Sequence, residues 1–244
     1  MPRFFVDTPP QDEIISITGD DARHIGRAQR MRIGDSLTVC HDKTDYICTI
    51  MSISDNEVVL KTLESRKACE PSIELTLFMA MPKSDKFESV IQKSTELGAV
   101  KIVPVLTRRC VSRPEKKQFQ KKLDRLNKIA LEAAKQSGRG IVPQVSDIIN
   151  LDECAQNIKD FDLSLVCYEK GGISLSECGL CSQSGGINKK IALIIGSEGG
   201  FDEDEILLLE SFGAKRIWLG ERILRCETAP VAAMSIIMHI TGNM

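Results

Sequence analysis

The chain has 244 residues, of which 42% are hydrophobic and 27% are charged. That length suits one large domain or a small domain joined to a medium one, with enough apolar residues for packed cores. The N-terminal MPRFFVDTPP becomes polar too soon for a signal peptide, and no apolar run approaches the ~20 residues that a membrane span needs. We therefore expect a cytoplasmic protein without a membrane anchor.

The cysteines do not form a recognisable disulfide or metal framework. There are nine of them, an odd number, and they are scattered along a chain whose core does not need disulfides. Cys178 and Cys181 form one CxxC, but tetrahedral metal sites come as paired ligand sets, and only three histidines are present. We expect reduced thiols and no bound metal.

The net charge of −2 conceals a basic band in the middle of the chain. Residues 101–142 hold 12 lysines and arginines against 3 acidic residues, which gives this band a net charge of +9. Such a band can bind a polyanion, because backbone phosphates are neutralised locally. The alternative is an ordinary solvated helix face around residues 116–128.

Residues 1–70 predict a small β domain, either a barrel or a sandwich. The segments 38–42, 46–53 and 57–65 are rich in β-branched residues and are separated by turn-forming residues. A group of arginines surrounds a predicted turn or short helix in this domain. These arginines either contact phosphates or are ordinary surface charge: Arg23, Arg27, Arg30 and Arg32.

From residue 73 to residue 244 the pattern alternates between strands and helices, which is typical of an α/β domain. The alternation predicts a parallel sheet with helices on both sides. The predicted strands are 74–81, 100–107, 163–169, 191–195 and 216–219. One predicted helix is capped by Ser84 or Asp85 and stops at Gly98, and a second spans about 115–137. Residues 171–190 are interpreted only as a loop.

Two glycine-containing loops follow predicted strands near the C-terminus. IALIIGSEGGFDEDEI (191–206) and RIWLGERILRCETAP (216–230) each read as strand, loop and helix. We expect both loops at the carboxyl ends of neighbouring parallel strands, where small ligands usually bind. Taken alone, the glycines of the first loop are a weak signal, and an ordinary strand-to-helix turn is the favoured alternative. Asp202 with Glu205 predicts a capping box, and Thr228 with Pro230 marks the start of the last helix.

These segments resemble the SPOUT class of S-adenosylmethionine-dependent RNA methyltransferases, and within it the RsmE family of 16S ribosomal RNA uracil-N3 methyltransferases. The family turn G-P-E-G-G-F reads Gly196-Ser197-Glu198-Gly199-Gly200-Phe201 here. The family segment L-G-x-R-I-L-R-x-E-T-A reads Leu219 through Ala229. Further similarities at 24–35, 91–98 and 132–139 extend the resemblance over nearly the whole chain. Ser197 and Glu221 depart from positions where the family has, or often has, proline.

The resemblance implies an architecture and partners that the pattern alone does not give. It implies a PUA-like RNA-binding β-barrel at 1–70 and a SPOUT methyltransferase domain at 73–244. The last strands and final helix of that domain would form a deep trefoil knot, an exception to the rule that chains do not thread themselves. It also implies a homodimer, S-adenosylmethionine as cofactor, and 16S ribosomal RNA within the small ribosomal subunit as partner.

The same resemblance assigns residues to the cofactor pocket, chiefly through backbone groups of the two loops. Ile223 and Leu224 are alternatively plain core residues. The implied cofactor-binding residues are Ile195, Gly196, Ser197, Gly199, Gly200, Leu219, Gly220, Ile223, Leu224, Arg225, Thr228 and Ala229.

Arg225, Glu227 and Glu198 are the catalytic candidates. Methylating N3 of uracil removes a proton and spreads negative charge over two carbonyl oxygens. Arg225 can stabilise that charge with planar paired donors, and a carboxylate of Glu227 or Glu198 can take the proton. The alternative is a surface or interface Arg–Glu pair. Cys226 is not expected to act as a nucleophile, because methyl transfer from a sulfonium needs no covalent enzyme intermediate.

The first helix of the α/β domain has a polar face that could meet RNA. Lys86, Gln92, Lys93 and Glu96 recur at helical spacing. Lys86, Lys93 and Arg139 of the QSGR segment are the candidate RNA contacts, with a solvated polar face as the alternative.

The leading functional hypothesis is methylation of uridine N3 in small-subunit ribosomal RNA. A second keeps the fold but changes the target to a ribose 2′-hydroxyl or a tRNA base. A third is a non-catalytic RNA-binding or ribosome-assembly factor, against which Gly196, Gly199, Arg225 and Glu227 argue. A nicotinamide oxidoreductase is disfavoured, because no G-x-G-x-x-G follows a strand. Matched site residues decide among these, since a fold alone does not imply a function.

Overall fold

The computed structural model describes residues 1–180 and 190–244, which form two compact units. The first unit comprises Met1–Glu70 and Ala134–Ile141, and the second comprises Pro71–Ala133 and Val142–Met244. Cys181 of the CxxC and the rest of residues 181–189 in the predicted loop 171–190 lie outside the described residues. No helix in the part of the chain that the structure describes is long and apolar enough to cross a membrane.

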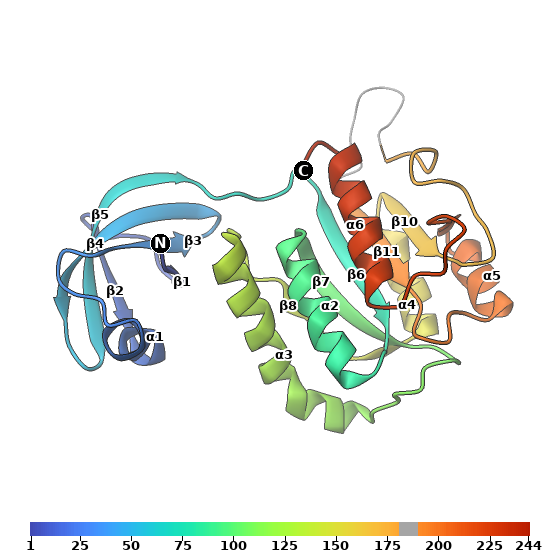
Figure 1. Ribbon diagram of the computed structural model, residues 1–244, viewed down its shortest axis with the longest axis horizontal. Helices are drawn as coiled ribbons and strands as arrows, with labels where there is room; N and C mark the ends of the chain where they lie inside the picture. The colour runs from blue at the N-terminus through green and yellow to red at the C-terminus, as the bar shows by residue number, and fades with distance from the viewer. Residues whose placement is uncertain (181–189) are drawn as a thin grey trace. The chain divides into compact units, whose positions relative to one another are not determined.

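The first unit is a curled sheet of five strands in the order β1-β3-β4-β5-β2 (Figure 1). Strands β1 and β3 are parallel and the other pairs are antiparallel. Because β1 and β2 stand at the two edges, the sheet curls into a half-barrel, and this confirms the expected barrel-like β domain in an open form. The strands are β1 (Arg3–Phe5), β2 (Ile14–Thr18), β3 (Ser36–His41), β4 (Thr44–Ile53) and β5 (Glu57–Lys67).

A short helical segment fills the concave side of this sheet. Helix α1 (Gly19–Arg23) continues into a π-helical turn, η1 (His24–Ala28). Ala22 and Ile25 of this segment are fully buried among apolar residues of the strands, including Phe4. The arginine-rich stretch of the sequence therefore begins on a helix whose apolar side belongs to the core and whose polar side faces solvent.

Arg139 fixes residues 134–141 to the first unit. The residue is only 3% exposed, and its guanidinium donates two hydrogen bonds of 2.8 Å to the carboxylate of Glu70. One oxygen of Glu70 also accepts the backbone N–H groups of Gly140 and Ile141 at 2.6 and 3.1 Å. The prediction that Arg139 contacts RNA is therefore wrong, because its donors are buried and already bonded within the protein.

The second unit contains an all-parallel sheet in the order β12-β10-β11-β6-β7-β8, with β9 also pairing with β7. The strands predicted from the sequence are all present. The dipeptides β8 and β9 were too short to leave a pattern. The strands are β6 (Glu74–Ala80), β7 (Ala99–Leu106), β8 (Gln144–Val145), β9 (Ile149–Asn150), β10 (Leu163–Cys167), β11 (Lys190–Ile195) and β12 (Lys215–Ile217).

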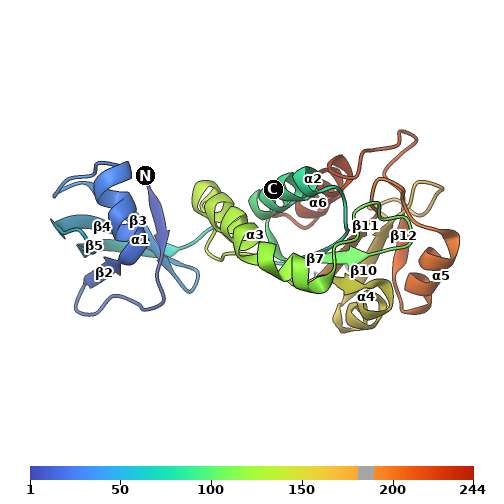
Figure 2. The same cartoon turned by 90° about the horizontal axis from the view of Figure 1, so that it is seen from below.

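Helices cover both faces of this sheet (Figure 2). Helices α2 (Ser84–Glu96), α3 (Lys116–Ser137) and α6 (Thr228–Ile240) pack on one face. Helices α4 (Leu151–Asn157) and α5 (Glu203–Ser211) pack on the other, and a 3₁₀ turn, η2 (Ile158–Asp160), follows α4.

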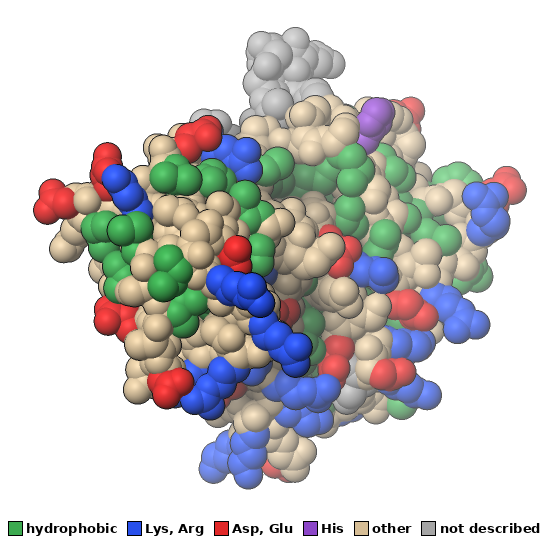
Figure 3. Space-filling model, turned by 60° about the vertical axis from the view of Figure 1, so that its left-hand side comes forward, with side chains coloured by type: hydrophobic (Ala, Val, Ile, Leu, Met, Phe, Trp, Pro, Cys, Tyr) green, Lys and Arg blue, Asp and Glu red, His purple; other side chains and the backbone are tan. Residues whose placement is uncertain are grey.

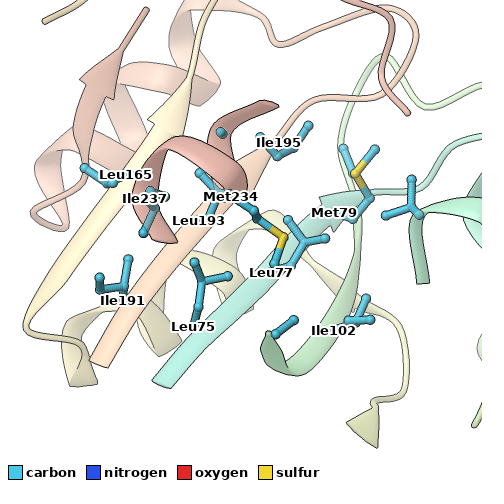
Figure 4. Close-up of a cluster of buried hydrophobic side chains, with 14 of the residues drawn as sticks. Leu75, Leu77, Met79, Ile102, Leu165, Ile191, Leu193, Ile195, Met234 and Ile237 are labelled. Carbon is cyan, nitrogen blue, oxygen red and sulfur yellow. The ribbon is translucent and has the colours of Figure 1, made fainter. Parts of the chain in front are cut away.

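The central strands are buried on both faces, which explains their continuous apolar sequences. On β11, Leu193 lies with Leu77 and Met234 in the core beneath α2 and α6 (Figure 4). Its neighbours Ala192 and Ile194 belong to the core beneath α4 and α5. Alternate residues of one strand thus anchor two helical layers.

The order of the strands corrects one expectation about the site. Strands β11 and β12, which lead into the two glycine-containing loops, are not neighbours, because β10 lies between them. All three strands run in parallel, so their carboxyl ends meet at one edge of the sheet. A third loop, the one after β10, therefore reaches the same place.

The ends of α2 also differ in part from the prediction. Lys83 is the N-cap residue and offers no side-chain cap, so the helix begins one residue earlier than a cap at Ser84 would place it. The carboxylate of Glu198 accepts the Lys83 backbone N–H at 3.2 Å instead. The C-terminal stop is as predicted, since Gly98 follows the helix with φ +96°.

The buried pair of Glu70 and Arg139 should contribute to the stability of the first unit. Glu70→Gln should lower the free energy of unfolding by about 3 kcal/mol or more, because it leaves a buried guanidinium without its counter-charge. The control is Asp55→Asn, which breaks the exposed pair with Arg27 and should cost about 1 kcal/mol or less. Urea denaturation measures both, and equal losses in the two variants would contradict the prediction.

Candidate active site

A pocket of about 460 Å³ lies at the carboxyl ends of β10, β11 and β12. Its walls come from residues 167–169 after β10, 195–201 after β11 and the 218–229 segment after β12, with Lys86 added from α2. Open parallel sheets usually bind small ligands at this edge. The pocket is therefore the candidate active site.

Most of the residues implied by the family resemblance line this pocket. Thr228 is the exception: its side chain is exposed, and its backbone N–H bonds the carbonyl of Arg225 at 2.8 Å. Ile223 is 83% exposed, so the alternative that it is a core residue is wrong. The lining residues from the implied set are Ile195, Gly196, Ser197, Gly199, Gly200, Leu219, Gly220, Ile223, Leu224, Arg225 and Ala229.

Several wall residues were not predicted. Tyr168 and Glu169 follow β10, and Trp218 and Arg222 belong to the loop after β12. The strand before Tyr168 was recognised from its apolar run, but its position between β11 and β12 is set by long-range pairing. In the sequence, these two wall residues are marked by the change from apolar residues to Tyr168 and Glu169 at the end of that strand.

Tyr168 forms a fixed wall of the pocket. Its ring is buried, and its hydroxyl donates to the carboxylate of Glu203 at 2.7 Å. Arg216 lies 5.1 Å from the ring centroid and forms an ion pair with Glu203 at 3.0 Å. Burial, followed by the bond to Glu203, raises the pKa of Tyr168 to about 12. The phenol therefore remains protonated and acts in packing.

The glycine turn after β11 is tight. The N–H of Gly200 bonds the carbonyl of Ser197 at 3.0 Å, and Gly200 adopts φ +66°, where L side chains are strained. A Cβ on Gly200 would lie 3.1 Å from the carboxylate of Glu169, and one on Gly196 would lie 3.1 Å from the Cα of Gly200. The glycines bring two pocket walls close together.

Arg109 holds this turn from outside the pocket. Its Nε donates to Asp202 at 2.6 Å, and its Nη1 donates to the carbonyl of Gly199 at 3.2 Å. The hydroxyl of Ser197 donates to the Arg109 carbonyl at 3.3 Å, so this departure from the family proline adds a bond. A Cβ on Gly199 would lie 2.8 Å from the Cβ of Arg109. The missing side chain of Gly199 thus leaves room for Arg109, while Gly199 itself lines the pocket.

The start of α5 is fixed in the way that the sequence predicts. The Glu205 carboxylate accepts the backbone N–H of Asp202 at 2.9 Å and that of Arg108 at 2.8 Å. The buried Glu205 therefore joins the glycine turn to the segment that carries Arg109.

Lys86 lies between the two glutamates that were predicted to be catalytic. Its Nζ is 3.3 Å from an oxygen of Glu198 and 3.4 Å from one of Glu227. The thiol of Cys226 is 3.9 Å from the same nitrogen and 3.2 Å from the Glu227 carboxylate. The structure therefore places Lys86 in the pocket wall among protein groups, instead of on the predicted RNA-facing surface.

These contacts set the charges of the cluster. Burial raises the pKa of Glu198, but hydrogen bonds from backbone N–H groups and Lys86 outweigh it and lower the pKa overall. The bond from its own backbone N–H, together with Cys226 and Lys86, lowers the pKa of Glu227. Burial and the neighbouring carboxylates raise the pKa of Cys226 to about 12. At neutral pH the cluster holds two carboxylates and a thiol.

The ammonium of Lys86 stays charged as well. Burial acts against its charge, but the bond to Glu198 and the charges of Glu198 and Glu227 outweigh burial and raise its pKa. Because their pKa values are lowered, both glutamates are weaker bases than an ordinary glutamate. Cys226 is a poor nucleophile, since its thiolate is scarce at neutral pH.

Arg225 lines the pocket and is available to a ligand. Its carbonyl accepts the N–H groups of Thr228 and Ala229 at 2.8 and 2.9 Å, which fixes the backbone at the start of α6. Its exposed guanidinium has no hydrogen bond or ion pair with any residue in 1–180 or 190–244. The alternative of an Arg225–Glu227 pair is not what the structure contains, because Glu227 pairs with Lys86.

Exposed basic side chains lie on both units, and they are prominent on the face drawn in Figure 3. In the first unit, Arg23 and Arg27 pair with Asp20 and Asp55. Arg30 and Arg32 are exposed, and the described residues include no side-chain partner for them. In the second unit, exposed basic side chains lie on α2 and α3: Lys93, Lys117, Lys121, Lys122 and Lys128.

Comparisons with known proteins identify the family. Residues 69–238 match the RNA methyltransferase domain family, and residues 17–63 match the RNA methyltransferase PUA domain family. The ribosomal RNA small subunit methyltransferase E of Bacillus subtilis (strain 168) is 36% identical to this chain over an alignment of 251 positions. The alignment covers 99% of this chain and 97% of that protein. The chain belongs to the ribosomal RNA small subunit methyltransferase E family.

Solved structures of similar proteins agree with this family assignment. The Neisseria gonorrhoeae ribosomal RNA small subunit methyltransferase E, bound to S-adenosyl methionine, has a TM-score of 0.87 at 26% identity over 98% of each chain. A Legionella pneumophila putative methyltransferase with bound SAM has a TM-score of 0.85 at 27% identity, over 98% of this chain and 97% of that one. The half-barrel of the first unit is thus the family's PUA domain, and the parallel sheet is its methyltransferase domain. Among residues 1–180 and 190–244 there is no group of three or more histidine, cysteine or acidic side chains suited to a metal ion.

Proposed function

We propose that this chain is an S-adenosylmethionine-dependent methyltransferase that methylates N3 of a uridine in 16S ribosomal RNA of the small subunit. The observation that carries the proposal is the pocket at the ends of β10, β11 and β12, which is lined by most of the residues that the two family motifs supply. Membership of a family whose relatives bind S-adenosylmethionine supports the same conclusion.

The pocket suits this cofactor in size and chemistry. A volume of about 460 Å³ lies in the range of small-molecule and cofactor sites. Leu219, Leu224 and Ala229 provide apolar surface, and the turns at Gly196 and Gly220 leave backbone groups accessible. S-adenosylmethionine supplies a methyl group on a positively charged sulfonium, and the carboxylates of Glu198 and Glu227 favour a positive charge nearby.

Arg225 contributes most of the chemistry that we assign to side chains. Its unpaired guanidinium can donate to a uracil carbonyl as negative charge develops on the ring. Glu198 and Glu227 have lowered pKa values, so they are weak proton acceptors and serve mainly to fix charge. The N3 proton passes to a water molecule and on to solvent as the methyl group is transferred, and S-adenosylhomocysteine is left in the pocket. The pocket walls contribute by holding the reacting atoms in line, which removes an entropic cost.

The direct test is methyl transfer in vitro. Purified protein is incubated with isotopically labelled S-adenosylmethionine and unmethylated small ribosomal subunits, and the RNA is digested to nucleosides for mass spectrometry. We expect label in N3-methyluridine. Label in a 2′-O-methylated nucleoside would support the ribose alternative, and RNA binding without any transfer would support a non-catalytic assembly factor.

Gly200 provides a test of the cofactor site. Gly200→Ala adds a methyl group 3.1 Å from the Glu169 carboxylate at φ +66°, so the turn must shift and cofactor affinity should fall on the order of 10-fold or more. Isothermal titration with S-adenosylmethionine measures this. The control is Gly213→Ala, which has a similar backbone penalty at φ +96° but open space around it and no place in the pocket. Equal affinities in the two variants would contradict the assignment.

Arg225 provides a test of the chemistry. Arg225→Ala removes the donors to the uracil carbonyl and should slow transfer on the order of 10²–10³-fold. Arg225→Lys keeps the charge without the planar fork and should slow it less. Cofactor affinity should change little in either variant. The measurement is single-turnover methylation of small subunits at saturating cofactor, and a near-normal rate for the alanine variant would remove Arg225 from the mechanism.

We propose that Arg30 and Arg32 of the first unit contact RNA phosphates, because both are exposed and neither guanidinium is bonded within the described residues. Replacing both with glutamate should weaken RNA binding and reduce the slope of log affinity against log salt by about 1–2. Cofactor affinity should be unchanged. Lys61→Glu is the control, because Lys61 already pairs with Glu13. Unchanged salt dependence in the double variant would exclude these contacts.

We also propose that the protein is a homodimer. Helix α6 is apolar on most of its surface, yet Ile236 is exposed, and Ile223 beside the pocket is more exposed still. In the proposed dimer, a second copy covers these two exposed apolar side chains. Sedimentation equilibrium should give twice the mass of the chain, and a monomeric mass at micromolar concentration would refute the proposal.

A further inference from the structure

Lys86 has no role in the chemistry described so far, yet it occupies a central place in the pocket wall. It lies in the first turn of α2, and its side chain is 25% exposed. Two carboxylates and a thiol surround its Nζ, at 3.3, 3.4 and 3.9 Å. A lysine that contacted RNA would instead keep its ammonium in solvent, as the exposed Lys93 on the same helix does.

The partners of Lys86 belong to segments that are far apart in the sequence. Glu198 belongs to the glycine turn after β11, and Glu227 is the N-cap residue of α6. The backbone N–H of Lys83 donates to the same Glu198 oxygen at 3.2 Å, so the first turn of α2 holds that carboxylate twice. One ammonium therefore joins three segments along one side of the pocket.

The two carboxylates need a shared cation to remain close together. Their side chains are 22% and 26% exposed, so water screens their mutual repulsion only in part. The groups that face Lys86 are Glu198 from the glycine turn, and Cys226 and Glu227 from the start of α6. Among residues 1–180 and 190–244, Lys86 is the one cation that forms ion pairs with both carboxylates. Without it, the repulsion would push the turn and the start of α6 apart.

We propose that Lys86 is a positioning residue for methyl transfer, whose ammonium holds the glycine turn and the start of α6 at a fixed separation. The inference rests on the proposed function, because the two segments that it joins form the proposed cofactor site. Arg225 lies two residues before Glu227, so the anchor at Glu227 also fixes the backbone from which the Arg225 guanidinium extends. Lys86 acts through these neighbours and not on the substrate.

The charge arrangement gives the proposal a signature in the pH dependence. Lys86 lowers the pKa of both glutamates, so its loss should raise both. A carboxylate with a raised pKa becomes protonated at a higher pH as the solution is acidified, and the cluster then loses its ion pairs. Loss of an opposite charge within 4–6 Å shifts a carboxyl pKa by about 1–3 units. A residue that only packed would leave the pH profile in place.

The experiment compares Lys86→Met, Lys86→Arg and the wild-type full-length chain. Methionine keeps the apolar stem and removes the charge, whereas arginine keeps the charge and changes its reach. Lys190→Met is the matched control, because Lys190 is exposed at the opposite end of β11. Single-turnover methylation of small subunits at saturating cofactor is measured between about pH 3.5 and pH 8, because the lowered wild-type pKa values lie below the ordinary glutamate value of about 4.3 and loss of Lys86 should move them upward.

For Lys86→Met we expect a rate at neutral pH that falls on the order of 10-fold, because misplaced groups lose alignment. We also expect the acid limb of its pH profile to move toward higher pH by about 1 unit. Lys86→Arg should restore the acid limb while keeping a reduced rate, and Lys190→Met should match the wild type. Thermal unfolding checks that each variant is folded. If Lys86→Met does not fold, a wild-type rate for Lys86→Arg overturns the proposal and a reduced rate supports it.

The outcomes separate this inference from the function on which it rests. If the wild type transfers methyl groups and Lys86→Met has the same rate and acid limb, the positioning role is wrong and the proposed function stands. If Lys86→Met is slower but its acid limb is unmoved, Lys86 only packs and the proposal is again wrong. If the wild type neither binds S-adenosylmethionine nor transfers a methyl group, the proposed function fails, and the inference fails with it.

Discussion

Parallel pairing of β12, β10, β11 and β6 is the constraint on which the rest of the site depends. The register pairs Val166 of β10 with Ile194 of β11, and Cys167 with Ile217 of β12. Three strands therefore end at the same level, and the loops that follow them meet. Burial on both faces holds this register, because a slip of one residue would exchange the side chains of the two helical layers.

Residues outside the loops that meet there hold the glycine turn in place. Arg109, from the segment after β7, holds the glycine turn through Asp202 and the Gly199 carbonyl. Lys86, from α2, holds the other side of the same turn through Glu198. A turn that must approach a ligand closely cannot carry large side chains of its own, so its rigidity comes from charged groups on neighbouring elements.

The same use of charge recurs in the first unit. The Glu70 carboxylate binds the Arg139 guanidinium and two backbone N–H groups, which fixes residues 134–141. Four bonds converge on one buried carboxylate, which satisfies its charge. The basic band of the sequence is thus partly structural: Arg109 and Arg139 serve the protein, while lysines along α3 stay exposed.

Local patterns in the sequence predicted much of the fold. The buried strands have continuous apolar runs, as 191–195 shows, and the long helix at Lys116–Ser137 has clear helical spacing. The glycine turn and the start of α6 were recognisable from their residues. Strands of two or three residues, such as β8 and β1, are too short to leave a periodic signal.

Long-range contacts could not be read from the sequence. The position of β10 between β11 and β12 depends on pairing across the sheet, so Tyr168 and Glu169 were missed as pocket residues. Lys86 and Arg139 looked like surface cations because polar residues precede them in the sequence, and only their partners more than 60 residues away show otherwise. The trefoil knot and the second copy of the chain stay predictions.

Hydrogen–deuterium exchange with and without S-adenosylmethionine tests most directly the claim that three loops form one cofactor site. The cofactor should slow exchange together in residues 167–169, 196–201 and 218–229, and leave the half-barrel of the first unit unchanged. Protection of only one of these loops, or protection elsewhere in the chain, would contradict the account.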